Sequence, residues 1–86
     1  MDFAPDRVEE LGKWYATEHL PGLGSVPGCV HTRRYMSAGG HSVACYDLVS
    51  GTVTETPQWL KWRSTPEAER MREHYRNMKR GMFRAL

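Results

Sequence analysis

The chain has 86 residues, 26% of them charged, and a formal net charge of +2, which describes one small domain spanning residues 1–86. So small a charge does not by itself indicate a polyanionic partner. The sequence has no apolar run of the roughly 18 residues that a transmembrane helix needs, and no signal-peptide pattern, so we expect neither. A chain of this length buries only about 60–65% of its unfolded surface, and a disulfide, a metal or a partner subunit usually compensates.

The two cysteines, Cys29 and Cys45, are predicted to be free thiols. If Gly39-Gly40 is the turn of a hairpin, Cys45 faces Arg34, and Cys29 lies about five residues further along, beyond the Cα separation of about 7 Å that a disulfide spans. Unpaired thiols are typical of a reducing cytoplasm, where we expect the protein. The sequence has no metal-binding or cofactor-binding motif. We therefore expect no metal, no cofactor and a homo-oligomer, most simply a dimer.

The first element is predicted to be an amphipathic helix. Asp6 can cap its start, with Glu9 three residues on. Its apolar face carries Val8, Leu11, Tyr15 and His19. Pro21 biases the preceding residue away from helical geometry, so we expect the helix to stop at Leu20-Pro21-Gly22.

Residues 29–36 and 42–49 are predicted to form a β-hairpin around Gly39-Gly40. The expected register places on one face Val30, Thr32, Arg34 and Met36 with Val43, Cys45, Asp47 and Val49. The other face then carries Cys29, His31, Arg33 and Tyr35 with Ala44, Tyr46 and Leu48. An error of one residue in the register would change the pairing across the hairpin but not the alternation within each strand.

Two Thr-Pro pairs predict two further helices, from residue 57 to about residue 63 and from residue 66 onward. In each pair the threonine hydroxyl can cap the helix, and the proline suits the first helical position. The second helix would carry Met71, Tyr75, Met78 and Met82 at helical spacing, although the same tail also alternates like a strand. The periodicity favours a helix.

The segment Trp14-Tyr15-Ala16-Thr17-Glu18-His19-Leu20-Pro21 resembles the W-Y-x-x-E-H-x-P signature of the EthD-like proteins of the dimeric α/β-barrel superfamily. Weaker similarities cover most of the remaining chain, at Val26-Pro27-Gly28, Arg33-Arg34-Tyr35, Tyr46-Asp47-Leu48 and Arg76-Asn77-Met78-Lys79-Arg80. The resemblance implies an α+β ferredoxin-like fold, in which helices cover one face of a sheet and a partner's sheet covers the other. It also implies a small enclosed pocket.

The sequence departs from that plan at its start, because only Met1 to Ala4 precede the first helix where the family has a full strand. The chain therefore looks like a ferredoxin-like domain that lacks its first strand, with a central hairpin packed on helices. In the family that strand is central, so its loss would separate the last strand from the hairpin. Three explanations stay open: a longer natural chain, strands rearranged between subunits, or a tail that remains helical.

His19 is the candidate catalytic residue, because it ends an apolar helix face beside a Gly/Pro-rich loop and its ordinary pKa suits acid–base chemistry. Tyr15 lies one turn earlier, and His31, Tyr35 and Tyr46 share one predicted hairpin face. If that face meets the helices, these side chains line a cavity for a flat aromatic or ketonic ligand. The alternative is that His19 anchors the loop and the tyrosines are core residues with polar tips.

The resemblance thus implies a small-molecule-handling protein of the cyclase or cofactor-free monooxygenase type, and a non-catalytic ligand-binding or interaction domain is the alternative. Whether the chain is an enzyme stays open at this point. Arg34 and Asp47 would form an ion pair at a subunit interface. A basic tail could bind nucleic acid, but Glu67, Glu69 and Glu73 are interspersed with its first cations, so a solvated helix face is the preferred explanation.

Overall fold

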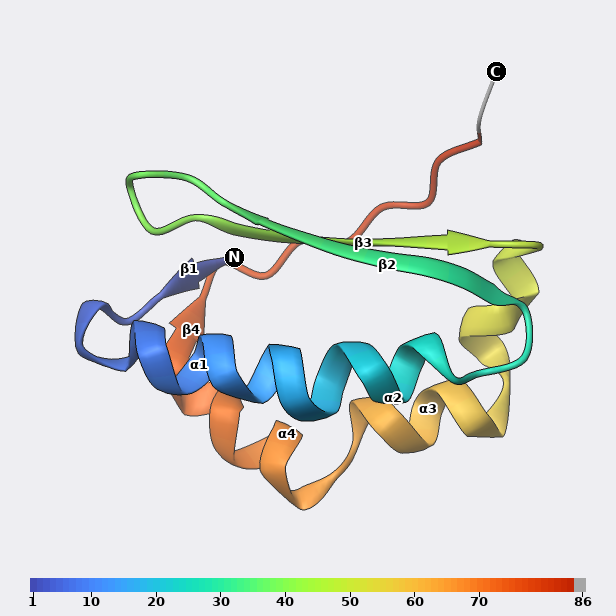
Figure 1. Cartoon of the computed structure of the whole chain (residues 1–86), viewed down its shortest axis with the longest axis horizontal. Coiled ribbons are helices and arrows are strands. Elements are labelled where there is room, and N and C mark those ends of the chain that lie inside the picture. Colours follow the sequence, from blue (N-terminus) through green and yellow to red (C-terminus); the bar gives the residue numbers. More distant parts are fainter. Residues whose placement is uncertain (85–86) are drawn as a thin grey trace.

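The computed structural model describes residues 1–84, and these form a small α+β structure in which a β-hairpin lies across a row of helices (Figure 1). The strands are β1 (Asp2–Phe3), β2 (Cys29–Met36), β3 (Ser42–Leu48) and β4 (Tyr75–Arg76). The helices are α1 (Val8–Trp14), α2 (Leu20–Gly24), α3 (Pro57–Arg63) and α4 (Pro66–Met71). Among these residues no helix has both the length and the apolar character needed to cross a membrane.

The first helix continues beyond the predicted stop. A π-helical segment, Tyr15–His19, joins α1 to α2, and Pro21 lies in the first turn of α2. The Leu20 amide donates to the Tyr15 carbonyl, five residues back, as in a π-helix. The hydrogen-bond pattern of the helix has therefore already changed before Pro21, which has no amide hydrogen to donate. The predicted Asp6 cap is also wrong: Asp6 lies in a short 3₁₀ turn, Pro5–Arg7, and the N-cap residue of α1 is Arg7, without a side-chain bond.

The hairpin register differs from the predicted one by one residue. Cys45 is opposite Arg33, not Arg34, because the turn is held by the Ser37 amide to the His41 carbonyl (2.9 Å) and a bulge follows Cys29. The face toward the helices carries Thr32, Arg34, Ala44, Tyr46 and Leu48, and the outer face carries His31, Arg33, Tyr35, Val43, Cys45 and Asp47. The prediction that His31, Tyr35 and Tyr46 share a face is therefore wrong.

A short first strand is present, contrary to the expectation that it is missing. Residues of β1 pair antiparallel with β4, and Asp2 forms an isolated antiparallel bridge with His41 at the start of the hairpin's second arm. The Ser42 amide also donates to the Met1 carbonyl (2.8 Å). The N-terminal segment thus lies between β4 and the hairpin, although the described residues form two separate two-stranded sheets and no closed barrel.

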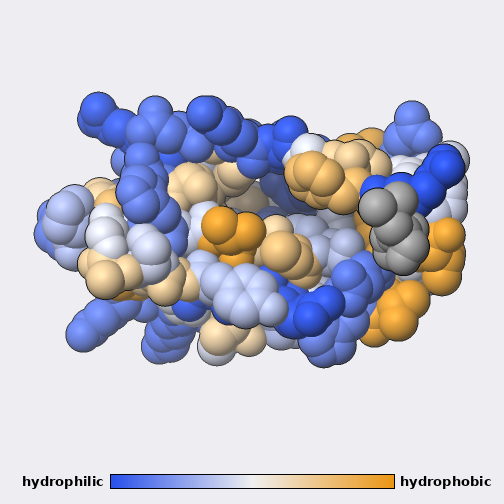
Figure 2. Space-filling model, turned by 90° about the horizontal axis from the view of Figure 1, so that it is seen from above, coloured by the Kyte–Doolittle hydropathy of each residue, from blue (hydrophilic) through white to orange (hydrophobic). Residues whose placement is uncertain are grey.

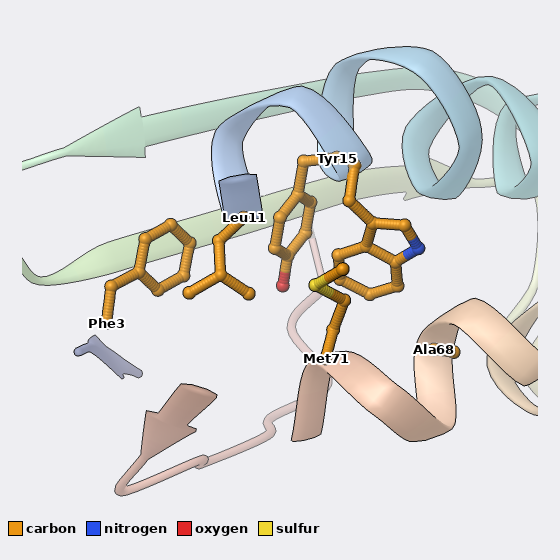
Figure 3. Close-up of a cluster of buried hydrophobic side chains, with 6 residues drawn as sticks. Phe3, Leu11, Tyr15, Ala68 and Met71 are labelled. Atoms are coloured by element: carbon orange, nitrogen blue, oxygen red, sulfur yellow. The ribbon is translucent and has the colours of Figure 1, made fainter. Parts of the chain in front are cut away.

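Two apolar clusters form the core. The first contains Phe3, Leu11, Trp14, Tyr15, Ala68 and Met71, contributed by β1, the first helix and α4 (Figure 3). The second contains Leu23, Val26, Val53 and Trp59, with Tyr46, Leu48 and Trp62 packed against it. The helices converge on these clusters from one side of the hairpin, and no helix of the described residues covers its other face.

The two Thr-Pro predictions are confirmed, and the predicted helical tail is not. The Thr56 hydroxyl accepts from the Trp59 amide (3.3 Å) and the Thr65 hydroxyl from the Ala68 amide (3.1 Å). The helix that begins at Pro66 ends at Met71, followed by a 3₁₀ turn and then β4. Residues 77–84 have no regular secondary structure. Pairing of Tyr75–Arg76 with β1 therefore prevails over the helical spacing of the methionines.

Candidate functional site

His19 lies half-buried at the end of the π-helical segment, among aromatic rings. It stacks on Trp14 with ring centroids 4.4 Å apart and meets Tyr15 edge-on at 5.1 Å. Its Nδ1 atom is buried and has no hydrogen-bond partner among residues 1–84. Burial, followed by the positive charges of Arg63 and Arg80, lowers the pKa of His19 to about 4. The imidazole is therefore neutral at neutral pH.

The π-helical segment is what brings Tyr15 and His19 together. Both residues lie within one widened turn, and π-helical turns frequently occur at functional sites. Tyr15 is buried, and among residues 1–84 its hydroxyl has only the Met1 sulfur, at 3.6 Å, as a partner. Burial raises the pKa of Tyr15 to about 12, so the phenol stays protonated and can donate.

Tyr46 approaches the same region from the hairpin. Its ring meets Trp59 edge-on at 5.2 Å, which ties it to the second apolar cluster. Burial, then the neighbouring Tyr15, raises the pKa of its phenol. The structure thus brings Tyr15, His19 and Tyr46 to one side of the hairpin, as the cavity hypothesis requires. It does not bring His31 or Tyr35 there, since both are exposed on the outer face.

Arg34 is a site residue that the sequence reasoning assigned elsewhere. Its guanidinium carbon lies 5.3 Å from the centre of the Tyr15 ring and 5.9 Å from that of Phe3. The predicted ion pair with Asp47 is wrong, because Asp47 binds Arg33 on the outer face at 2.9 Å. A hairpin register shifted by one residue pairs Arg34 with Ala44 and so places it on the face that also carries Tyr46.

These residues define a polar seam, by which we mean Tyr15, His19, Arg34, Tyr46 and Arg63, where the two apolar clusters meet. Arg63 comes from the end of α3, and its charge acts on both His19 and Tyr46. The buried atoms that lack a partner within residues 1–84 include Nδ1 of His19 and Nη1 of Arg34. A buried polar atom left unpaired costs about 1–3 kcal/mol, so the seam is suited to a polar ligand or to water.

Two surface hollows border the helices and the short strands, and the first is lined in part by Trp14, on which His19 stacks. One, of about 380 Å³, lies between α1 and α4 and includes Lys13, Glu18 and Met71. Another, of about 400 Å³, adjoins β1 and β4 and includes Phe3 and His74. Neither is lined by His19, Tyr15 or Tyr46.

The remaining predicted features have ordinary structural roles. Arg70 and Arg72 form ion pairs with Glu67 and Glu69 along α4, which agrees with a solvated helix face. Cys29 and Cys45 are free thiols. Residues 1–84 contain no cluster of metal-binding side chains. Comparison of the chain with protein-family models, with curated proteins and with solved structures gives no match.

Proposed function

We propose that the protein handles a small, flat phenolic or ketonic ligand at the polar seam, in the manner of the EthD-like proteins that its W-Y-x-x-E-H-x-P segment resembles. The observation that carries the proposal is the buried, unpartnered Nδ1 of His19 beside the Tyr15 ring. Aromatic side chains that end in polar groups suit a flat ring whose oxygen needs a hydrogen bond. Neutral Tyr15 and Tyr46 would supply the donors.

The strand arrangement supports a ferredoxin-like ancestry for this site. β4 pairs with β1, β1 bridges the start of the second hairpin strand, and that strand pairs with β2, all antiparallel. The described residues form two separate two-stranded sheets, and we propose that the bridge between Asp2 and His41 marks a shortened form of the ferredoxin-like strand order 4-1-3-2. In this interpretation the first strand, which was predicted to be missing, is present but short.

Within this proposal His19 acts as a general base. A neutral imidazole can accept a proton from a carbon next to a ketone or from a phenol and return it later, which is the step that cyclase-type chemistry requires. The rival role is an anchor that holds the end of the helix on the core. Stacking of His19 on Trp14 and its pKa of about 4, which makes the imidazole a weak base at neutral pH, favour the anchor, and its unpartnered nitrogen favours the base.

Proton exchange separates these two roles without knowledge of the natural substrate. The protein is incubated with 2-tetralone in D₂O, and deuterium uptake next to the carbonyl is followed by NMR. A general base predicts catalysed exchange that His19→Ala abolishes and that the exposed-residue control His31→Ala preserves. A non-catalytic domain predicts no exchange above the buffer rate in any variant, with His19→Ala lowering thermal stability alone.

We also propose that the protein self-associates through the outer face of the hairpin. Apolar side chains on and beside this face are exposed: Val49 by 72%, Val30 by 69%, Tyr35 by 55% and Val43 by 54%. Figure 2, which views the molecule from the hairpin side, shows hydrophobic patches near the centre and at one end of this face. Covering them with a second copy would add the apolar burial that so small a core lacks.

A further inference from the structure

The polar seam carries positive charge that no acid within the described residues 1–84 pairs with. The ion pairs formed within residues 1–84 engage the acids Asp2, Glu10, Asp47, Glu67 and Glu69. None of these pairs involves Arg34 or Arg63. Both arginines are nevertheless half-buried. Burial of a charge is costly unless the charge is paired, so an anion at this place would stabilise the folded protein.

The Arg34 guanidinium is held by its surroundings and keeps one unpartnered donor among residues 1–84. The ring faces of Tyr15 and Phe3 lie 5.3 and 5.9 Å from its carbon, which fixes it by cation–π attraction. Its Nη2 lies against α1, where a methyl group added at Gly12 would stand 3.4 Å away. Its Nη1 is buried and unpartnered within the described chain. The guanidinium thus has a fixed orientation and an unused donor.

The other cations of this region repel one another, which is a second and independent indication. Burial and the charges of Arg80 and Arg72 lower the pKa of Arg63. Arg80 also acts on both His19 and Tyr15. Arg34 of β2 and Arg80 of the C-terminal segment therefore act on Tyr15, and Arg63 of α3 acts with Arg80 on His19. An anionic group placed there would relieve this repulsion.

From this geometry we infer that the ligand is an aromatic carboxylate, and that Arg34 binds its carboxylate group while Tyr15 and His19 contact its ring. The inference rests on the proposed function and specifies its ligand class. A carboxylate matches the planar guanidinium fork of arginine, which can donate two parallel hydrogen bonds to it. The half-buried Arg34 guanidinium, set among aromatic rings, favours this planar monoanion over a phosphate or a nucleic acid, which strong, exposed charge would bind.

The test compares two ligands that differ only in charge. Affinities of 6-hydroxy-2-naphthoate and its neutral amide, 6-hydroxy-2-naphthamide, are measured by calorimetry for the full chain, for Arg34→Gln and for the matched control Arg33→Gln. Loss of a charged hydrogen-bonded contact typically changes affinity by about tenfold or more. In the wild type and in Arg33→Gln, we expect the carboxylate to bind at least about tenfold more tightly than the amide. In Arg34→Gln, we expect the two ligands to bind with equal affinity.

Equal binding of the two ligands by the wild type would overturn the inference and leave the proposed function intact. Binding of neither ligand by the wild type would overturn both. If Arg34→Gln still prefers the carboxylate, Arg34 is not the residue that binds the carboxylate group. Should Arg34→Gln fail to fold, Arg34→Lys replaces it: it keeps the charge but loses the fork, so it should retain only part of the preference, and full retention would contradict the geometry.

Discussion

Protonation of His19 is expected to destabilise the folded protein between pH 6.5 and pH 4. The folded pKa of about 4 lies below the ordinary value of 6.5, so the unfolded chain binds this proton more tightly. The stability associated with neutral His19 is therefore complete above pH 6.5 and is lost as the pH falls toward 4. That pKa difference corresponds to about 3 kcal/mol, a large share of the stability of a domain of this size.

The groups that face His19 favour its neutral form and so keep its pKa low. Trp14 and Tyr15 are uncharged, and Arg63 and Arg80 are positive, so none of these neighbours carries a negative charge that would stabilise an imidazolium. The Asp2 carboxylate, whose pKa is lowered by Asn77 and then by His41, titrates in a lower pH range and belongs to a different part of the fold. Loss of stability just below neutral pH can thus be assigned to His19.

The measurement is urea unfolding followed by circular dichroism at pH 7, 5.5 and 4, at one fixed protein concentration. His19→Gln should remove most of the difference between pH 7 and pH 5.5, whereas His31→Gln, on the exposed outer face, should keep the wild-type profile. Equal profiles for the wild type and His19→Gln would refute the reasoning, since they would mean that His19 titrates alike in the folded and unfolded chains.

Three further predictions concern packing, capping and assembly. Gly22→Ala should destabilise the protein by about 1–3 kcal/mol, because the new methyl carbon would overlap the Trp62 ring. In the control Gly24→Ala, the new methyl carbon would lie 3.5 Å from its nearest neighbour, an ordinary contact. Equal midpoints of the two variants in thermal unfolding would contradict this prediction. Thr65→Ala should cost about 1 kcal/mol through loss of the α4 cap, and Thr65→Ser should restore it in the same assay. Val43→Asp should shift sedimentation toward a monomer while the circular dichroism spectrum is unchanged, and a wild-type monomer at micromolar concentration would remove the self-association proposal.

The sequence correctly predicted the elements whose formation depends on a few neighbouring residues. A threonine followed by a proline places a side-chain acceptor and a residue without an amide donor where a helix begins, and both such helices start there. The hairpin was likewise indicated by its β-formers and paired glycines. Each of these features depends on a few neighbouring residues.

The errors concern features that non-local contacts decide. The hairpin register depends on a five-residue turn, residues 37–41, and a bulge, which the two central glycines do not specify. The helix passes Pro21 because a π-helical turn changes the bonding first. The tail leaves its helical periodicity because Tyr75 and Arg76 pair with a strand more than seventy residues earlier in the chain. Of the candidate site, Tyr15, His19 and Tyr46 were predicted together, and Arg34 was missed through the register error.

The composition of the seam itself argues for a site. An 86-residue chain has little stability to lose, yet it places an imidazole and a guanidinium, each with an unpartnered nitrogen, beside Tyr15. Each of these buried polar groups lowers the free energy of unfolding relative to an apolar residue of similar size. Preorganised polar groups held at a cost in stability are the usual signature of a binding or catalytic site, because a ligand that pairs with them recovers that cost on binding. The seam meets this description, because Nδ1 of His19 and Nη1 of Arg34 are both buried without a partner among residues 1–84.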